Sequence, residues 1–353
     1  MVEQMLAGAY DNAALFHVRM NFSRDLNSVG RIRLRKLAEL LSVLFRIVWN
    51  RLRYEADVLY FPPAGPSLVP VMRDIVLLSL TRWMFRITIF HFHAGGLNEI
   101  YAKLPRPLKY FFRVAYWKPE VVIRLSPHAP NDGDFLQAKR QVLIPNGIPD
   151  QAEPLLCHTS QEQGPSRLLY VGSLREDKGL MVLLKACCDL RKRGADFQLN
   201  CVGDFSSNDF RNAVMEFVSI SGLSSSVFFP GILTGTEKNH QFAQAEIFCF
   251  PSFYNSEVFP LALLEALSFA LPIVATSWRG IPDIVGDSGA AFLVPIRNES
   301  AVAEQLTKLI EDPILRRRMG VAGREHFLRH FTLRRHYGHL QELFDSLHNA
   351  DLN

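Results

Sequence analysis

The stretch that decides the fold runs from Ile247 to Val294 and reads IFCFPSFYNSEVFPLALLEALSFALPIVATSWRGIPDIVGDSGAAFLV. Its first four residues form an unbroken apolar run, which is typical of a strand buried on both faces of a parallel sheet. A polar loop follows, and then a helix whose start is marked by Pro260 and whose end is marked by Pro272. The next strand is predicted from Ile273 to Thr276. This succession of strand, loop, helix and strand indicates an α/β fold.

Two carboxylates frame the loop and the helix of this unit. Glu257 stands just before the helix, and Glu265 lies about one and a half turns inside it. Most pairs of glutamates at such a spacing are surface residues that only face water, so the spacing alone does not distinguish a functional pair from an ordinary surface pair. Both groups, however, follow the carboxyl end of a strand, which is where open α/β sheets bind ligands. The unit therefore predicts a ligand site at this edge of the sheet.

The wider motif consists of Pro251-Ser252, Asn255, Glu257-Val258-Phe259-Pro260-Leu261, Leu264-Glu265-Ala266, Leu271-Pro272-Ile273 and Gly280-Ile281-Pro282. It resembles the donor-site signature of glycosyltransferase family 4, the retaining GT-B enzymes of the glycosyl transferases group 1 type. The resemblance implies that Glu265 binds the ribose hydroxyls of a nucleotide sugar and that Glu257 faces the transferred sugar. It also implies that the amides of Val258 and Phe259 meet the sugar or its diphosphate. The family commonly has glycines where this chain has Val258 and Pro260, and proline has no amide hydrogen to donate.

A second motif opens the C-terminal half, where a predicted strand from Arg167 to Val171 leads into the turn 172–179, GSLREDKG. A helix through Arg193 follows, and a helix N-terminus beside a lysine is a ready phosphate site. Alone, this pattern is common. Beside the glutamates it resembles the diphosphate-binding turn of the family, formed here by Gly172, Ser173, Arg175 and Lys178. Ser173 stands where the family often has arginine, and Gly231 is expected near the nucleotide base.

The chain length of 353 residues suits two domains of about 150 to 180 residues each. We predict an N-terminal acceptor-side domain over 1–150, a donor-binding domain over 151–332, and a C-terminal helix over 333–353. The turn at Pro145-Asn146-Gly147 marks the first boundary. The resemblance implies the GT-B fold: two Rossmann-like, doubly wound α/β domains that face each other across a cleft. It also implies that the last helix crosses back to the first domain.

The N-terminal half alternates strands and helices in the rhythm of a doubly wound sheet. Strands are predicted at Ala14–Val18, Asp57–Phe61, Arg86–Phe92, Val121–Leu125 and Val142–Ile144, with helices near 31–54, 69–84, 106–116 and 132–139. In the C-terminal half, further strands are predicted at Phe197–Val202 and Val227–Phe229, with helices at Ser300–Glu311, Pro313–Phe327 and Leu333–Leu347. Members of the family usually open with a strand and a glycine-rich turn, which the first residues do not supply; this leaves the activity of the acceptor side open.

His93 is the candidate catalytic residue of the N-terminal half. It ends an apolar strand and is followed by Ala94-Gly95-Gly96, a turn where the backbone can approach a ligand. A histidine at a strand end is more often structural, and His91 shares the same face of the strand. The resemblance places a histidine here near the transferred sugar and the acceptor, and His93 lies nearer to the strand end.

The net charge of +4 hides an asymmetry. Residues 1–150 hold 20 lysines and arginines against 12 aspartates and glutamates, whereas the remainder holds 19 against 23. The stretch Arg31 to Arg53 is basic and apolar, so it is either a helix on an anionic membrane surface or an ordinary basic helix packed on a sheet. Nucleic acid is disfavoured because no binding motif is present.

The remaining features indicate a cytoplasmic protein, or one attached peripherally to the inner face of the cytoplasmic membrane. The chain shows no signal peptide and no apolar run of the roughly 18 residues that a membrane span requires. The five cysteines lack metal-binding spacing, which favours buried thiols in a reducing compartment; they are Cys157, Cys187, Cys188, Cys201 and Cys249.

The function predicted from these observations is a metal-independent, retaining glycosyltransferase. A nucleotide diphosphate sugar donates to a glycan or lipid-linked acceptor, and Lys178 with the helix amides stabilises the leaving diphosphate. No cofactor and no metal are expected, because Asp132-Gly133-Asp134 lies in a polar loop and no other D-x-D motif ends a strand. Two alternatives remain open: a sugar-nucleotide epimerase on the same scaffold, and a non-catalytic nucleotide-sugar-binding protein. A dehydrogenase is disfavoured because no G-x-G-x-x-G follows a strand.

Overall fold

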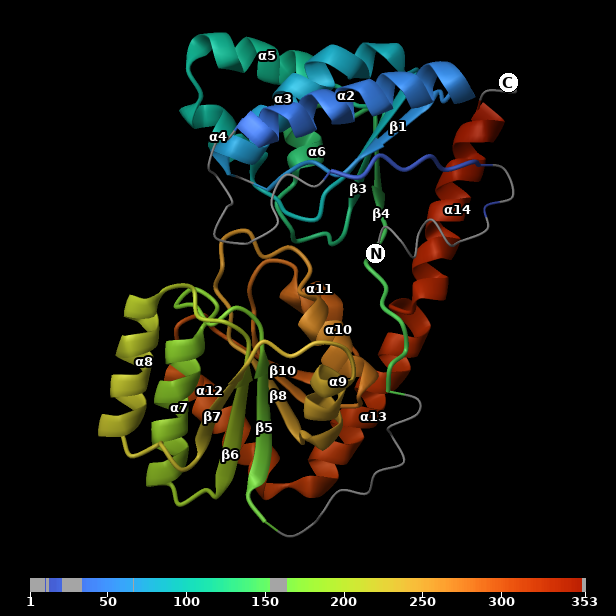
Figure 1. Ribbon diagram of the computed structural model, residues 1–353. Coiled ribbons are helices and arrows are strands. Elements are labelled where there is room, and N and C mark those ends of the chain that lie inside the picture. Colours follow the sequence, from blue (N-terminus) through green and yellow to red (C-terminus); the bar gives the residue numbers. More distant parts are fainter. Residues whose placement is uncertain (1–9, 11–12, 21–33, 66, 153–163, 351–353) are drawn as a thin grey trace. The chain divides into compact units, whose positions relative to one another are not determined.

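The computed structural model describes residues 10, 13–20, 34–65, 67–152 and 164–350. The chain divides into two compact units, one formed by residues 1–145 with 337–353 and the other by residues 146–336. Each unit contains one sheet in which all strands are parallel (Figure 1). The predicted α/β class is therefore confirmed.

The first unit is built on a four-stranded sheet in the order β1-β2-β3-β4. Its strands are β1 Val58–Phe61, β2 Ile87–His91, β3 Val121–Arg124 and β4 Arg140–Leu143. Its helices are α2 Leu34–Tyr54, α3 Leu68–Thr81, the 3-10 turn η2 Arg82–Met84, α4 Leu97–Lys103, α5 Arg106–Tyr116 and α6 Asp132–Phe135. Buried side chains of α2, α3 and α5 pack on one face of the sheet against Leu59, Phe90 and Val122. All five residues of β2 are buried, as its apolar sequence predicts.

The other face of this sheet is covered by the C-terminal helix α14, Leu333–Ala350. Leu340 and Leu343 pack against Ile89 and Ile123, which alternate with the residues that face the first helical layer. The first unit thus recruits residues 337–353. It ends at residue 145 rather than 150, because the amide of Ile148 binds the carbonyl of Phe331 at 2.9 Å and ties that segment to the second unit.

Two of the predicted elements of the first unit differ from the structure. Residues 14–18 are described but form no strand; a run of apolar residues is not sufficient without a paired neighbour. The helix predicted over 132–139 is only four residues long, because the chain has to enter β4 at Arg140. Helix α4 was not predicted. Residues 1–9, and with them most of the opening segment that we expected to lack a strand, lie outside the described part.

The second unit contains a six-stranded sheet in the order β10-β9-β8-β5-β6-β7. The strands are β5 Ser166–Val171, β6 Phe197–Val202, β7 Val227–Gly231, β8 Ile247–Phe250, β9 Ile273–Thr276 and β10 Ala291–Val294. The helices are α7 Leu180–Lys192, α8 Asn208–Ile220, α9 Gly235–Gln244, α10 Leu261–Ser268, α11 Ile281–Val285, α12 Glu299–Glu311 and α13 Pro313–His330. Figure 1 shows α7 and α8 on one side of the sheet and α9, α10 and α13 on the other, which makes it doubly wound.

The order of these strands reverses once. From β5 the chain proceeds outward through β6 to β7, and then returns to β8, which pairs with the other side of β5 through Leu168 and Ile247. From β8 it proceeds outward again through β9 to β10. The strands predicted in this half are confirmed, whereas β10, α8, α9 and α11 were not predicted. Among the described helices, none is long and apolar enough to cross a membrane.

Candidate functional site

The predicted donor-site residues of the second unit lie where the strand order reverses. The loop after β5 carries Lys178 and the loop after β8 carries Glu257, and these two strands are neighbours in the sheet. Because the strands are parallel, their carboxyl ends open at the same edge. Open α/β sheets bind ligands at this type of position, since the loops diverge to the two sides and leave a crevice.

The two loops are held in direct contact. Gly179 has φ +80°, and a Cβ at this position would lie 2.0 Å from the carbonyl oxygen of Pro251, so only glycine fits. The amide of Phe253 also donates to the carbonyl of Asp177 at 2.8 Å. This close approach brings the residue before Gly179, which is Lys178, to the β8–α10 loop.

Lys178 and Glu257 form an ion pair at this place. The Lys178 Nζ donates to the Glu257 Oε2 at 2.6 Å, and the Ser252 hydroxyl donates to the same oxygen at 2.8 Å. The side chain of Glu257 is 8% exposed and that of Lys178 is 17% exposed. The ammonium also lies 4.6 Å from the ring centre of Tyr254, which gives it a cation–π contact. The structure therefore brings together two residues that are 79 positions apart in the sequence.

Arg175 lies on the same aromatic ring. Its guanidinium is 5.0 Å from the ring centre of Tyr254 and forms two hydrogen bonds with the Asp177 carboxylate, at 2.9 and 2.6 Å. The hydrogen bond to Asp177 raises the pKa of Arg175 above its ordinary value. The carbonyl of Ser173 accepts from the buried Tyr170 hydroxyl at 3.0 Å, and the amide of Gly172 donates to Val202. Arg175 is thus placed beside Lys178, but its charge is partly balanced within its own loop.

Glu265 is paired with a lysine that the sequence analysis did not single out. The Lys238 Nζ, on α9, donates to the Glu265 Oε1 on α10 at 2.5 Å. Their side chains are 26% and 17% exposed, so the pair is accessible at one side. The only signal in the sequence is a lysine in the first turns of a polar helix, and such lysines usually face water. Lys238 is therefore the additional charged residue of this site.

The remaining predicted residues are less closely gathered. Val258 and Phe259 are buried, and the Phe259 ring packs on Phe331 with centroids 5.8 Å apart. Pro260 caps the N-terminus of α10 and is not its first helical residue. Gly231 ends the edge strand β7, two strands away from β5, and its carbonyl accepts from the Gly203 amide at 2.9 Å. The ligand contacts predicted for Gly231, Val258 and Phe259 stay predictions.

His93 belongs to the first unit, where it follows β2 and is exposed. Its ring lies 4.2 Å from that of His91, which is buried and hydrogen-bonded through Nδ1 to the Tyr60 hydroxyl. The nearby turn is fixed by Asp132, whose carboxylate accepts from the amides of Gly96 and Leu97 at 2.9 Å each. The difference in exposure favours His93 over His91 for contact with a ligand, and its catalytic role stays a prediction.

Asp132 is the first carboxylate of the only D-x-D motif considered above. Burial raises its pKa to about 6, although the two amide hydrogen bonds act in the opposite direction. Asp134 accepts from the side chains of Asn131 and Gln141. The motif lies on the short helix α6 and not in a loop, and both carboxylates serve local structure. Within the described parts of the chain, no three His, Cys, Asp or Glu side chains gather so that they could hold a metal ion.

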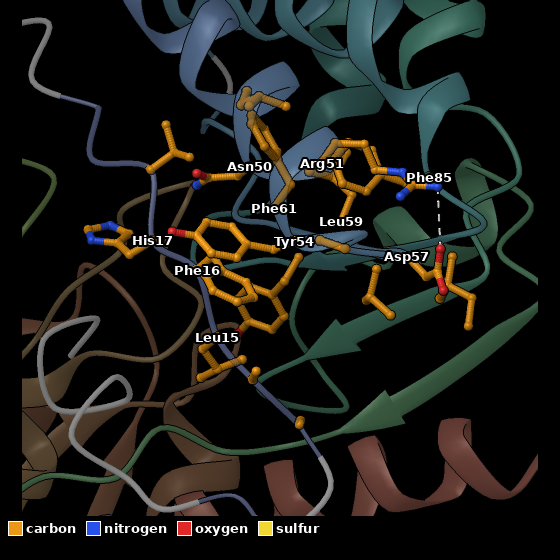
Figure 2. A pocket seen from close by; sticks show the side chains of 18 of the residues that line it. Leu15, Phe16, His17, Asn50, Arg51, Tyr54, Asp57, Leu59, Phe61 and Phe85 are labelled. Atoms are coloured by element: carbon orange, nitrogen blue, oxygen red, sulfur yellow. Dashed lines mark ion pairs between the residues drawn. The ribbon is translucent and has the colours of Figure 1, made fainter.

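A cavity of about 740 Å³ in the first unit contains none of the predicted site residues. It is lined by residues 13–20, by the inner side of α2 and by β1, and its walls are mainly apolar. Figure 2 shows Phe16 stacked on Tyr54, with ring centres 4.0 Å apart, and the ion pair of Arg51 with Asp57 at 3.4 Å. Size alone does not make this cavity the reactive site, because it lacks a cluster of catalytic side chains.

Known proteins are similar to this chain in sequence and in fold. Residues 159–326 match the family model of Glycosyl transferases group 1. The putative colanic acid biosynthesis glycosyltransferase WcaL of Escherichia coli (strain K12) is 29% identical over 146 residues, which are 40% of this chain and 35% of WcaL. The chain thus spans about a third of the length of this curated relative.

Two solved structures are similar over most of the chain. A glycosyltransferase from Rickettsia africae ESF-5 has a TM-score of 0.70 and 17% identity, with 90% of this chain and 83% of that chain covered. Anabaena HepE, solved in complex with UDP, has a TM-score of 0.68 and 17% identity, with 86% and 82% covered. Together with the two parallel sheets, these neighbours define the fold class as GT-B, built from two Rossmann-like domains. Within that class, residues 159–326 are similar to the glycosyl transferases group 1, whose family model they match.

Proposed function

We propose that this protein is a glycosyltransferase that moves a sugar from a nucleotide diphosphate sugar to a hydroxyl group of a glycan or lipid-linked acceptor. The observation that carries this proposal is the ion pair of Lys178 with Glu257 at the strand-order reversal of a glycosyl transferases group 1 domain. A cation and a carboxylate at that position suit the two ends of a sugar diphosphate, which are anionic phosphates and sugar hydroxyl groups.

The diphosphate would bind at Lys178 and at the N-terminus of α7. Gly179 occupies the N-cap position of this helix, where no side chain binds the free backbone amides. The first turn of the helix contains no acidic residue. Its first amides are therefore suited to phosphate oxygens, and the helix dipole favours the negative charge. Lys178 would stabilise the charge that develops on the leaving diphosphate, which is electrostatic catalysis.

The nucleoside would bind at Glu265. A carboxylate can accept hydrogen bonds from both hydroxyl groups of a ribose. In the structure that carboxylate is occupied by Lys238, so ribose binding would exchange a lysine for two hydroxyl donors. The crystal structure of HepE contains UDP, which makes UDP the first nucleotide to test.

The reaction would proceed with retention of the anomeric configuration, as in glycosyltransferase family 4, with the acceptor hydroxyl attacking on the face that the diphosphate leaves. Glu257 would orient the sugar through its hydroxyl groups and would not act as a covalent nucleophile. His93 would contact the transferred sugar or the acceptor. No metal and no cofactor would take part, because Lys178, Arg175 and the α7 amides supply the positive charge at the diphosphate.

The acceptor and the place of action follow from chemistry and similarity. WcaL is described as a glycosyltransferase of colanic acid biosynthesis, and we extend that setting, envelope polysaccharide assembly, to this chain. A lipid-linked acceptor would lie at the inner face of the cytoplasmic membrane, with the protein bound peripherally.

Thermal unfolding of the wild type and of Glu265→Gln with UDP, GDP and ADP, each with and without Mg²⁺, tests the donor site. A nucleotide at a hundred times its Kd adds about 2.7 kcal/mol to the free energy of unfolding. We expect one nucleotide to stabilise the wild type without metal, and Glu265→Gln to lose most of that stabilisation. Glu304→Gln is the matched control, since Glu304 also binds a lysine, Lys308, but on the distant helix α12. Absence of stabilisation by all three nucleotides would contradict the proposal.

Product analysis separates the enzyme from its two alternatives. The matching nucleotide sugar is incubated with and without a membrane extract that contains acceptors. Conversion of the sugar without acceptor would indicate an epimerase, and binding without any turnover would indicate a non-catalytic protein.

A further inference from the structure

The helical layer of the first unit exposes an unusual set of large apolar side chains. Six of these exposed residues are Phe45, Trp49 and Leu52 on α2, Trp83 on η2, and Tyr110 and Phe111 on α5. Phe45 is 67% exposed, Leu52 70% and Trp83 77%. Single exposed apolar residues are ordinary on a protein surface, but a group of six on packed helices indicates an interaction surface. We call these six residues the apolar face.

The exposed side chains of α2 form one stripe. Phe45, Trp49 and Leu52 follow each other at spacings of four and three residues, and the rings of Phe45 and Trp49 stack with centroids 6.1 Å apart. Val43, two residues before Phe45, and Ile47, between Phe45 and Trp49, are buried and pack with the residues of the sheet. Helix α2 is therefore apolar on two sides, and only one of them is used by the fold.

Two hydrogen bonds join the elements that carry these exposed residues. The Arg51 Nε donates to the carbonyl of Met84 at 2.8 Å, which joins the C-terminal end of α2 to η2. The Ser79 hydroxyl donates to the carbonyl of Phe111 at 3.4 Å, which joins α3 to α5. Figure 1 shows α2, α3 and α5 side by side as one layer on the sheet of this unit.

The charges around the apolar face are mainly positive, although Glu55 is exposed after the end of α2 and Asp57 pairs with Arg51. Helix α5 contains Arg106, Lys109 and Arg113 and no acidic residue. Helix α2 contains Arg46 and Arg53, both exposed, and a single acid, Glu39. The one acid of α3 is Asp74, which is buried and held by Arg73 at 2.5 Å. A partner of this surface should therefore be anionic as well as apolar.

We propose that the apolar face with its basic neighbours binds the surface of an anionic lipid bilayer. Tryptophan, tyrosine and arginine side chains suit the boundary between headgroups and acyl chains, because each combines an apolar body with a polar or charged end. Anionic lipid attracts basic residues that lie near its surface. The surface includes α5, and residues 31–33 of the basic stretch considered from the sequence lie outside the described part. That the acceptor lies on the same bilayer rests on the proposed function.

Vesicle flotation tests this inference without any sugar nucleotide, so its outcome is independent of the donor site. The full chain is mixed with phosphatidylcholine vesicles that contain or lack phosphatidylglycerol. We expect binding only with phosphatidylglycerol, and weaker binding at high salt. Trp49→Ser with Trp83→Ser should weaken binding about tenfold or more. Arg46→Gln with Arg106→Gln should have a similar effect.

The matched control removes equally exposed apolar side chains from the second unit, with Ile220→Ser and Ile314→Ser, which replace residues 79% and 82% exposed. These variants should bind vesicles like the wild type. Thermal unfolding of every variant shows whether it is folded. A blue shift of tryptophan fluorescence on addition of anionic vesicles, lost in the double tryptophan variant, reports insertion directly.

Three outcomes would overturn the inference. The wild type could ignore anionic vesicles, or the control variants could lose as much binding as the tryptophan variant. In the third case, sedimentation shows a dimer of the wild type that Trp83→Ser converts to a monomer, which would assign the apolar face to a second copy of this chain.

Discussion

Breaking the ion pair of Lys178 with Glu257 should destabilise the second unit in a way that a double substitution repairs. The Glu257 carboxylate has two side-chain donors, the Lys178 ammonium at 2.6 Å and the Ser252 hydroxyl at 2.8 Å. Lys178→Met leaves a carboxylate that is 8% exposed with one neutral donor. Glu257→Gln leaves the ammonium without its counter-charge. Lys178→Met combined with Glu257→Gln leaves no uncompensated charge.

The magnitude follows from the burial of the two side chains. Removing one partner of a fully buried ion pair costs about 3 to 5 kcal/mol. Lys178 is 17% exposed, so water screens part of this penalty, and we expect each single variant to lose about 2 kcal/mol. For a unit of this size that corresponds to a fall in Tm of about 4 to 8 °C. The double variant should lose less than the sum of the single variants by about 1 to 2 kcal/mol.

The assay is urea unfolding of the wild type, the two single variants and the double variant. Each is made in a background with Trp49→Phe, Trp83→Phe and Trp117→Phe, so that the fluorescence of Trp278 reports the second unit alone. Glu304→Gln, which breaks the exposed pair with Lys308, should leave the free energy of unfolding unchanged within the error of the measurement, because water screens that pair. Strict additivity of the two single variants would refute the reasoning, because it would show that the two side chains do not interact in solution. Full stability of Lys178→Met would refute it as well.

Three further outcomes are expected. Lys238→Met should bind UDP about threefold more tightly by calorimetry, because the lysine no longer competes for Glu265; weaker binding would show that Lys238 itself contacts the nucleotide. Gly179→Ala should cost the second unit more than 2 kcal/mol in urea unfolding, whereas Gly194→Ala, at a similar φ of +78° with open space around it, should cost about 1 kcal/mol. Burial raises the pKa of Asp132 from 3.8 to about 6, so the free energy of unfolding of the first unit should fall by about 2 to 3 kcal/mol as the pH rises from about 4 to 7. Asp132→Asn should remove that part of the pH dependence, and equal pH profiles of the two proteins would contradict it.

The strands and most of the helices were predictable because their signals are local. Four consecutive apolar residues followed by a proline predict the strand from Ile247 to Phe250, and the structure confirms it. Residues 14–18 have a similar apolar content but pair with no strand, since pairing depends on what lies beside them in space. The prediction of a helix over 132–139 was too long for a related reason. The sequence alone does not show that the chain must leave the helix early in order to enter β4 at Arg140.

The candidate site was predictable where a motif spans strand, loop and helix, as it does for Lys178 and Glu257. Their contact required two loops to meet, and the sequence marks that meeting only through Gly179. Lys238 could not be predicted in the same way, because nothing in the sequence of the polar helix α9 indicates that its lysine pairs with Glu265 on α10. The apolar face could be predicted only in part. The composition of α2 indicates its contribution, but the contribution of α5 depends on which side of that helix packs on the rest of the unit.

The two lysine–glutamate pairs explain how an anion site can be stable before its ligand arrives. An unpaired carboxylate at the depth of Glu257 would be costly, and so would an unpaired ammonium beside it. Pairing Lys178 with Glu257, and Lys238 with Glu265, balances both charges in the ligand-free protein. A nucleotide diphosphate sugar would then supply phosphate oxygens to Lys178 and hydroxyl donors to the two carboxylates, and would release Lys238 to the solvent that already reaches it. Because the pairs are partly open to water, this exchange needs little loss of interaction energy, so the binding free energy is left for contacts that the ligand alone can make.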